Sequence, residues 1–340
     1  MVPLRFVQFQ KTLLIHLVLK LNNYPWILKA SYMKGVVCDK MKKISPKVYI
    51  TQFKTSVVEG ERGLILIDPG DDEVIKKLDG KRKLSGSLLE AYELWEETGK
   101  PIKYVILINS QKEHIFNLET LARIRRSRIK DFVNYTIITH LNSPLVEGDL
   151  IKINGDLLIN LDGIEIKFLS TPGPSKTKDD LSIWLPEEEV LFVGDLLQPQ
   201  GESYEEANFL SPLPYFFYGD EYLLSLEKLL QIPFNIVRTG YGHTLNSVRA
   251  KQWIEVTKTV ITRIKEIVEE VLKKNINEDK SRICEKVFDT ITYERNFNRE
   301  VALRRKYALN YRDKSDFELF DCPGILYFIE KLKRKGDVAQ

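Results

Sequence analysis

The segment at residues 104–114 limits the choice of fold for this chain more than any other. It begins with the apolar run Y-V-I-L-I and passes into the polar turn N-S-Q-K-E-H, after which an apolar-periodic segment runs to Ile124. A buried strand that ends in ligand-type side chains just before a helix is where α/β proteins usually place their chemistry. The segment therefore predicts an α/β fold with a functional site at the end of this strand.

The regions on either side predict further elements of a layered fold. The run L-I-L-I at residues 64–67 is apolar on both sides, which predicts an interior strand covered on both faces. Residues 71–99 are predicted as helices and residues 118–129 as a roughly amphipathic helix, followed by a β meander over residues 148–168. His140 is interpreted as a strand-end histidine rather than a metal ligand.

Four further motifs follow in a fixed order along the chain. They are V-V-E-G-E-R-G-L-I-L-I-D-P-G at residues 57–70, L-S-T-P-G-P at 169–174, a hairpin pattern ending in Gly-Asp at 182–195, and T-G-Y-G-H at 239–243. Together with the strand and turn at 104–114, these motifs resemble the landmarks of the metallo-β-lactamase superfamily in order and spacing. The resemblance implies a four-layer αββα sandwich, followed here by a C-terminal helical domain.

The resemblance also implies where the metal ligands of active members would lie. In those relatives five imidazoles and two carboxylates hold two metal ions, and this chain replaces most of the imidazoles. Asn109 and Gln111 stand at the first two histidine positions, and Pro174 and Tyr241 stand at the histidine positions of the later loops. The seven corresponding positions are Asn109, Gln111, Glu113, His114, Pro174, Asp195 and Tyr241.

These replacements remove more ligands from the first metal position than from the second. Neutral amide oxygens are poor substitutes for imidazole on zinc, and proline has no side-chain donor, so the first position keeps only Asp195 as an ionic ligand and is predicted to be empty. The second position retains Glu113, His114 and Asp195, with either Tyr241 or His243 as a fourth ligand. A tyrosine would have to ionise from a pKa of about 10 to bind there. In the metal-free alternative, these groups hydrogen-bond one another, supported by Asp68.

Two functional hypotheses from different classes follow. In the first, the protein is a pseudo-enzyme whose former active-site cleft, edged by residues 196–218, binds a small ligand or a protein partner, and no cofactor is expected. In the second, it is a mononuclear hydrolase of a thioester, lactone or phosphoester, with one zinc, iron or manganese ion on His114 and Asp195 and with Glu113 as ligand or base. Nucleic-acid binding through the C-terminal helices is a third hypothesis. The sequence does not identify catalytic residues.

The amino-acid composition limits which partners and which cellular compartment are expected. The 51 basic and 48 acidic side chains leave a net charge of only +3, which predicts neither a polyanion binder nor an acidic substrate. Cys38, Cys284 and Cys322 are far apart and form no CxxC pair, so neither a zinc knuckle nor a disulfide framework is predicted. A reducing, cytoplasmic setting is expected, and the high Lys, Arg and Glu content resembles that of thermophile proteins.

The chain is predicted to have three parts. Residues 1–40 are a basic N-terminal extension with a short apolar run, interpreted either as a mis-assigned start before Met33 or Met41 or as a helix packed on the body or on a partner. Residues 41–245 carry the metallo-β-lactamase-like pattern. Residues 246–340 are predicted to be helical, beginning with an apolar stripe that recurs every three or four residues. This tail loosely resembles the winged-helix-like appendage of some superfamily members, whose final helix ends in a similar basic run.

Overall fold

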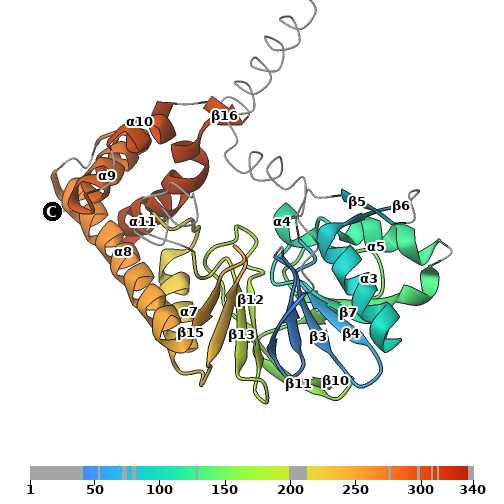
Figure 1. Ribbon diagram of the computed structural model, residues 1–340. Helices are drawn as coiled ribbons and strands as arrows, with labels where there is room; N and C mark the ends of the chain where they lie inside the picture. Colours follow the sequence, from blue (N-terminus) through green and yellow to red (C-terminus); the bar gives the residue numbers. More distant parts are fainter. Residues whose placement is uncertain are drawn as a thin grey trace, which may run out of the picture. The chain divides into compact units, whose positions relative to one another are not determined.

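A computed structural model of the chain describes residues 41–52, 54–70, 75–78, 82–127, 129–198, 213–274, 277–296, 299–307, 309–311 and 314–335 (Figure 1). All of these residues belong to one compact unit, residues 41–340. The predicted N-terminal extension, residues 1–40, lies outside the described residues.

The first of two large sheets has seven strands in the order β1-β2-β3-β4-β7-β8-β9. The first four strands pair antiparallel in hairpins, whereas β4, β7, β8 and β9 lie parallel to one another. The strands are β1 (Lys42–Ser45), β2 (Val48–Ile50), β3 (Ser56–Glu59), β4 (Leu64–Ile67), β7 (Ile102–Ile106), β8 (Val133–His140) and β9 (Leu150–Ile153).

The second sheet has six strands in sequence order, and only β13 and β14 pair in parallel. Its strands are β10 (Leu157–Leu161), β11 (Ile164–Ser170), β12 (Leu181–Leu185), β13 (Val190–Gly194), β14 (Ile236–Thr239) and β15 (Thr244–Asn246). The β meander predicted over residues 148–168 is only partly right. The strands β10 and β11 form an antiparallel hairpin, but β9 pairs in parallel with β8 in the first sheet, so the chain passes from one sheet to the other between β9 and β10. The apolar alternation predicts each strand but does not say which strand it pairs with.

The two sheets pack face to face because their strands carry apolar side chains on the inner face. Ile65 and Ile67 of β4 share one buried cluster with Ile166 and Phe168 of β11. Leu64 and Leu66, which point the other way, belong to a second cluster beneath the helices on the outer face. A strand with apolar residues on both faces is therefore covered on both sides, as predicted.

Helices cover the outer faces and complete four layers. On the first sheet lie α3 (Gly86–Thr98) and α5 (Leu118–Arg125), whose buried faces join the cluster of Leu64 and Leu66. On the second sheet lie α7 (Gly219–Leu230) and α8 (Ser247–Lys274). The predicted αββα arrangement is confirmed.

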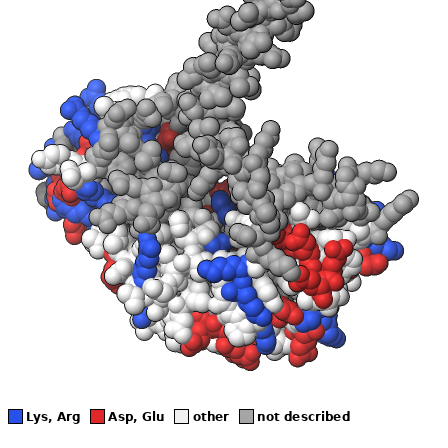
Figure 2. Space-filling model, in the orientation of Figure 1, with Lys and Arg blue, Asp and Glu red and all other residues white. Residues whose placement is uncertain are grey.

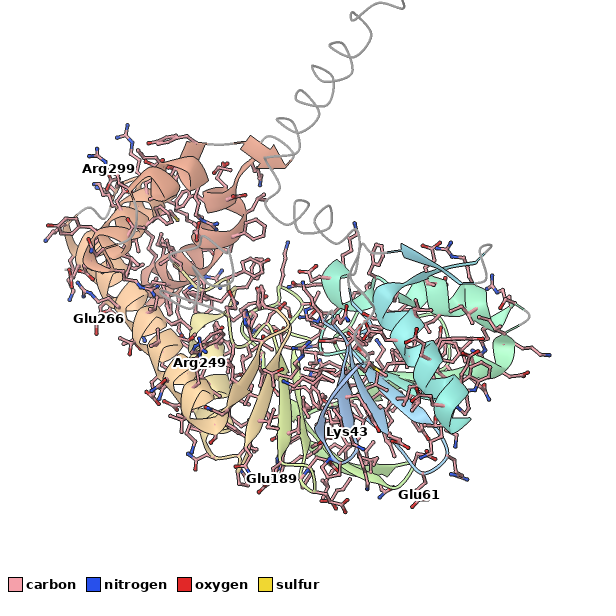
Figure 3. All side chains as sticks on the ribbon, in the orientation of Figure 1. Lys43, Glu61, Glu189, Arg249, Glu266 and Arg299 are labelled. Atoms are coloured by element: carbon pink, nitrogen blue, oxygen red, sulfur yellow. The ribbon has the colours of Figure 1, made fainter. Side chains whose placement is uncertain are left out.

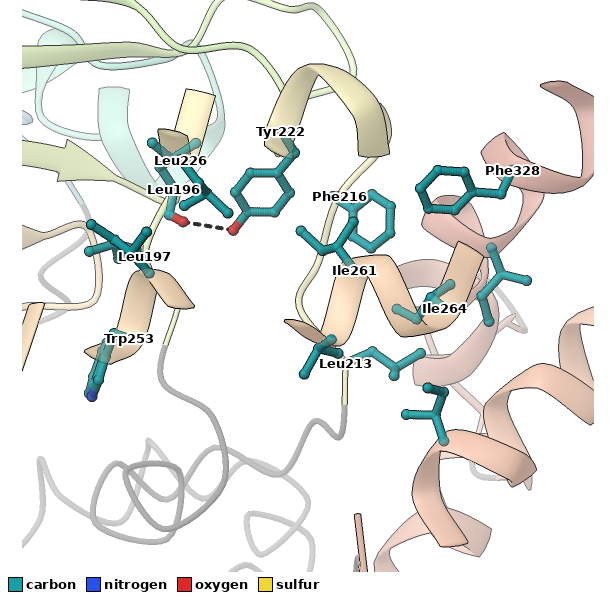
Figure 4. Close-up of a cluster of buried hydrophobic side chains, with 14 of the residues drawn as sticks. Leu196, Leu197, Leu213, Phe216, Tyr222, Leu226, Trp253, Ile261, Ile264 and Phe328 are labelled. Atoms are coloured by element: carbon teal, nitrogen blue, oxygen red, sulfur yellow. Dashed lines mark hydrogen bonds between the residues drawn. The ribbon is translucent and has the colours of Figure 1, made fainter. Parts of the chain in front are cut away.

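The C-terminal helices continue the core of the second sheet. Figure 4 shows Tyr222 of α7, whose hydroxyl donates to Leu196 O (2.7 Å), beside Phe216, Ile261 of α8 and Phe328. These residues belong to one hydrophobic cluster that runs from the second sheet to the last helix. The same cluster contains residues from both sides of residue 245. The domain boundary predicted there therefore stays a prediction. The helices and short elements beyond α8 are α9 (Lys280–Glu294), α10 (Arg299–Tyr307), β16 (Leu309–Tyr311), β17 (Lys314–Ser315), the π-helix Phe317–Asp321 and α11 (Cys322–Lys335).

Three details differ from the predictions. Residues 71–99 were expected to be helical, but β5 (Ile75–Leu78) and β6 (Arg82–Ser85) form an antiparallel hairpin before α3 begins. The Asp79-Gly80 dipeptide between them is a common hairpin signal that outweighs the local acidic pattern. The helix predicted at 118–129 ends at Arg125, and a short 3-10 helix, Lys130–Phe132, precedes β8. The C-terminal part also contains a small hairpin besides its helices.

Charged side chains are distributed without a dominant sign on the visible face of the molecule. Figure 2 shows Lys and Arg in some groups and Asp and Glu in others on the described part of this face. Among the described residues, no helix combines the length and the apolar character needed to cross a bilayer.

Candidate functional site

The candidate site lies where four strand ends meet. Asp68 follows β4, residues 109–114 follow β7, and Asp195 follows β13, while the start of β12 is held there by the hydrogen bond from Leu181 N–H to Ile108 O (2.8 Å). The turns that precede β4 and β13 lie at the other end of the sheets, where Glu61 and Glu189 project outward (Figure 3). The parallel strands thus gather polar residues at their carboxyl ends, as the sequence predicts.

A buried histidine links the two halves of the site. His114, in the short helix α4 (Lys112–Ile115), is 2% exposed, and its Nδ1 lies 2.8 Å from Asp68 Oδ2 while its Nε2 lies 3.0 Å from Asp195 Oδ2. The other oxygen of Asp68 accepts from Ile108 N–H (2.8 Å). Both ring nitrogens of His114 therefore face carboxylates.

This arrangement stabilises the protonated imidazole. Burial alone would lower the pKa of His114, but the charges and hydrogen bonds of Asp68 and Asp195 raise it well above its usual value. Burial opposes ionisation of Asp195, yet His114, Lys54 and Asn109 together hold the pKa of that carboxyl below its usual value. The pair of carboxylates therefore favours the protonated form of His114 over the neutral one.

Backbone geometry aims both carboxylates at His114. Asp68 adopts a left-handed backbone with φ of 48°, which few residues other than glycine adopt, at the corner between β4 and Gly70. Gly194 has φ of 52°, and a Cβ there would lie only 2.3 Å from Ile108 Cγ2. The glycine before Asp195 therefore permits the close approach of β13 to the end of β7.

Asn109 presents its amide nitrogen, and not its oxygen, to the acidic residues. Its Oδ1 accepts the backbone N–H of Gln111 (2.9 Å), and this donor fixes which way the amide is turned. Its Nδ2 then lies 3.4 Å from Asp180 Oδ1 and 3.3 Å from Asp195 Oδ2. An N–H donor therefore occupies a place where relatives would present a metal-binding imidazole.

Two aspartates that the sequence reasoning missed complete the site. Asp179 accepts from Ser110 N–H (2.9 Å) and from the Ser175 hydroxyl (2.9 Å), and Asp180 accepts from Ser175 N–H (2.9 Å). Burial, with the nearby charges of Asp179 and Asp195, raises the pKa of Asp180 to about 7. The sequence pattern that could have predicted them is a pair of adjacent aspartates just before a buried strand, in the loop that begins with T-P-G.

The other predicted residues lie around this centre. Glu113 is exposed on α4, and Pro174 is buried in the loop that holds Asp179 and Asp180. Lys54 Nζ lies 6.0 Å from the ring centroid of Tyr241. The ring of His243 packs edge-on against Trp253 of α8, with centroids 5.5 Å apart.

His140 lies at the end of β8, where the sequence places it. Its Nδ1 accepts from Asn142 N–H (3.1 Å), and its Nε2 lies 3.4 Å from the Ser170 hydroxyl. Burial lowers the pKa of His140, in contrast to His114. The pKa of His114 is raised and that of His140 is lowered because only His114 faces two carboxylates.

A cationic side chain approaches the site from the loop before β3. Lys54 lines a small cavity of about 10 Å³ together with Asp68 and Gly240, and its charge favours the ionised form of Asp195. A space of this size holds about one water molecule. Lys54 and His114 together hold the pKa of Asp195 below its usual value.

A partly buried tyrosine, Tyr215, lies near the carboxylates. Burial raises the pKa of the Tyr215 phenol, and so do the charges of Glu113, Asp195 and Asp180. Its ring contacts Phe217, with centroids 5.3 Å apart, and Phe320 of the C-terminal part, with centroids 5.6 Å apart. Phe320 itself is 44% exposed.

The donor set fits a dinuclear metal centre poorly. At the first position Asn109 directs N–H groups toward Asp195, and Pro174 supplies no donor. At the second position, His114 Nε2 and Asp195 Oδ2 are close enough to bind one ion together, but only if the proton on His114 leaves. Across the described ranges, no three or more His, Cys, Asp or Glu side chains are grouped so that they could hold a metal ion.

Comparison with known proteins assigns the family. The family model described as "Metallo-beta-lactamase superfamily" matches residues 54–240, which is more than half of the chain. The chain therefore belongs to the metallo-β-lactamase superfamily. The match begins within the first sheet and ends just after β14, so it covers every strand end that forms the site.

Individual relatives are distant. A "Beta-lactamase-like protein 2 homolog" from Caenorhabditis elegans is 23% identical over 190 residues, which are 55% of this chain and 55% of the relative; the chain thus matches about half the length of this curated protein. The structure of an inverting sec-alkylsulfatase from a Pseudomonas species covers 86% of this chain and 50% of that one, with 12% identity and a TM-score of 0.56. A metallo-β-lactamase from Pontibacter korlensis covers 66% and 98%, with 15% identity and a TM-score of 0.47. At such identities the structural likeness shows the fold alone.

Proposed function

We propose that this protein is a metal-free, non-catalytic member of its superfamily, and that the surface above the former metal positions binds a small ligand or a protein partner. The observation that carries the proposal is the pairing of His114 with Asp68 and Asp195 through both ring nitrogens. The amide of Asn109, turned toward Asp180 and Asp195, supports it. The protein's own donors thus satisfy carboxylates that would otherwise need metal ions.

The protonation of His114 opposes metal binding directly. A metal ion binds the neutral imidazole, so it must first release the proton that Asp68 and Asp195 stabilise. Each unit by which the pKa of His114 exceeds the solution pH lowers the apparent metal affinity about tenfold. The same carboxylates that would attract a metal ion therefore favour the proton that competes with it.

The surroundings of Tyr215 support binding at the former active site. Its ring joins Phe217 and the partly exposed Phe320 in edge-to-face contacts, so aromatic surface lies next to the buried acids. Aromatic side chains with an exposed edge are common where proteins bind ligands or partners. Tyr215 also lies near Glu113, whose charge contributes to its raised pKa.

Metal analysis tests the proposal. The purified protein is incubated with zinc, manganese or iron, passed through a desalting column and analysed for metal content, and its Tm is measured with and without each ion. We expect much less than one equivalent of bound metal and an unchanged Tm, because a metal that bound the folded state would raise it.

Two variants make the metal experiment specific. Tight stoichiometric metal that is lost in His114→Ala but kept in His140→Ala would refute the metal-free proposal. His140 is the matched control because it is also buried but hydrogen-bonds Asn142 and Ser170. Metal that both variants lose equally would indicate damage to the fold, which circular dichroism of the two proteins detects.

One observation favours a second candidate function, a mononuclear hydrolase. His114 Nε2 and Asp195 Oδ2 are 3.0 Å apart and Asp68 lies behind Nδ1, and a carboxylate on the far nitrogen is common in histidine metal ligands. In this candidate, Glu113, His114, Asp195 and His243 would hold one zinc, iron or manganese ion, which would activate water against a thioester, lactone or phosphoester. Metal-dependent turnover of such a substrate that His114→Ala abolishes would establish it in place of the metal-free proposal.

A further inference from the structure

Strand β10 lies at the edge of the second sheet. Among the described residues it pairs only with β11, in an antiparallel register that sets Leu157 opposite Phe168 and Leu161 opposite Ile164 (Figure 1). A free strand edge presents a row of backbone N–H and C=O groups that a further strand can bind. The other side of β10 can therefore accept one more strand.

The hairpin turn after β10 determines which backbone groups face the free edge. Asp162 and Gly163 have φ of 52° and 81°, which is typical of a two-residue type I′ turn. The residues that flank such a turn form a hydrogen-bonded pair, and hydrogen-bonded and non-hydrogen-bonded pairs then alternate along the two strands. Counting back from the turn, Leu158 and Asn160 direct their N–H and C=O groups away from β11 and toward the free edge.

The side chains of this edge are apolar and uncharged. Leu157 is 41% exposed and Leu158 is 53% exposed, and the strand contains neither a charged residue nor a proline. Edge strands usually carry such residues as protection against self-association, and β1, at an edge of the first sheet, exposes Lys42 and Lys43. The edge of β10 thus has the character of a surface that another chain covers.

We propose that two copies of this chain form a dimer through β10, which pairs antiparallel with β10 of the second copy about a two-fold axis at Leu158. The backbone N–H and C=O of each Leu158 then bond those of the other, and the two six-stranded sheets become one continuous sheet. On the inner face, the partly exposed Leu157 packs against Ile159 of the second copy. The dimer does not depend on the function proposed for the buried site, because no residue of β10 belongs to that site.

The charges at the ends of β10 select this axis. An axis one residue later, at Ile159, would also satisfy the free backbone groups, but it would set Asp156 opposite Asp162 of the second copy. With the axis at Leu158, Asp156 lies opposite Asn160 instead. The Oδ1 of Asn160 accepts a backbone N–H of the hairpin turn (2.9 Å), which leaves Nδ2 to donate to the acid. β10 is therefore complementary to a second copy of itself in charge and in hydrogen bonding.

The association state of the full-length protein tests the proposal. Sedimentation equilibrium is measured over a series of protein concentrations, and we expect twice the chain mass of 39.6 kDa, with monomers appearing on dilution. In Leu158→Lys two ammonium groups face each other across the axis, so we expect the dissociation constant of the dimer to rise about tenfold or more. Leu224→Lys, which replaces a leucine that is 66% exposed on α7, is the matched control and should dimerise like the wild type.

A charge exchange locates the axis. Leu158→Asp alone should weaken the dimer as Leu158→Lys does, because like charges again face each other. An equimolar mixture of the two variants should recover dimerisation with one chain of each kind, which native mass spectrometry identifies from their different masses. Such recovery requires that residue 158 of one copy lies opposite residue 158 of the other.

Other results would overturn the proposal. A wild-type protein that stays monomeric at every concentration does so, whichever segment or partner covers the β10 edge instead. A dimer that Leu158→Lys leaves intact uses a different surface, and a mixture that does not recover rules out the axis at Leu158, so either result also overturns it. If circular dichroism shows that a variant is unfolded, hydrogen exchange of the wild type replaces it. The amides of Leu158 and Asn160 should exchange more slowly in the dimer than after dilution, and equal rates would contradict the pairing.

Discussion

Replacing Asp180 by asparagine should remove a pH-dependent cost from the folded protein. The pKa of Asp180 is raised from 3.8 to about 7, with burial as the largest cause. A carboxyl whose pKa is raised by folding stabilises the folded state below its unfolded pKa, and this contribution is lost as the pH rises through the folded value. Asp180 should therefore weaken the fold progressively between about pH 4 and about pH 7.

The size of the effect follows from the shift. A rise of roughly three pKa units corresponds to about 4 kcal/mol of stability lost by pH 8, at about 1.4 kcal/mol per unit. Asp180 is only 3% exposed, so solvent screening reduces this figure little. Asparagine keeps an oxygen for Ser175 N–H but brings its own N–H group toward Asn109, so we expect a gain of about 2–4 kcal/mol at pH 8 and little at pH 4.

Urea unfolding of both proteins from about pH 4 to about pH 8.5 measures the difference. The raised pKa of His114 also makes stability fall at high pH, and the lowered pKa of Asp195 makes it fall at low pH, but both act in each protein and largely cancel. Asp131→Asn, at an exposed aspartate, is the control and should change nothing. A difference between wild type and Asp180→Asn that stays flat across the range would refute the reasoning.

Three further substitutions test the site. His114→Ala leaves Asp68 and Asp195 buried without their shared cation, so it should cost about 3–5 kcal/mol of unfolding free energy at pH 7, and a loss below about 1 kcal/mol would contradict the ion-paired arrangement. Gly240→Ala would place a Cβ 2.9 Å from Asp195 Oδ1 and 3.1 Å from His114 Cε1, which should lower stability in urea by about 1–3 kcal/mol, and an unchanged midpoint would count against this packing. Asn109→Asp adds a negative charge beside Asp180 and Asp195, so thermal melts should show a cost of about 3 kcal/mol at pH 8 and a smaller one at pH 5, where a carboxyl can take up a proton. An equal cost at both pH values would indicate a steric and not an electrostatic cause.

Much of the fold could be predicted from local patterns. Alternating apolar and polar residues, and runs that are apolar on both faces, predict the strands. Five motifs in a fixed order between residues 57 and 243 indicate the sandwich, because each motif is a short strand followed by its own turn. The region at residues 75–85 shows the limit of such patterns. The acidic residues just before it suggest a helix and its Asp-Gly dipeptide suggests a hairpin, and the pairing of β5 with β6 shows that the hairpin forms.

The sequence by itself determined the kinds of group at the site: an amide, a proline and a phenol stand where relatives carry imidazoles, and His114 and Asp195 remain. Only the tertiary structure decided what those groups do to one another. The orientation of the Asn109 amide depends on a backbone N–H two residues away, and the charge on His114 depends on Asp68 and Asp195, which come from different sheets. Asp179 and Asp180 became part of the site because packing brings together residues whose distance along the chain carries no information about contact.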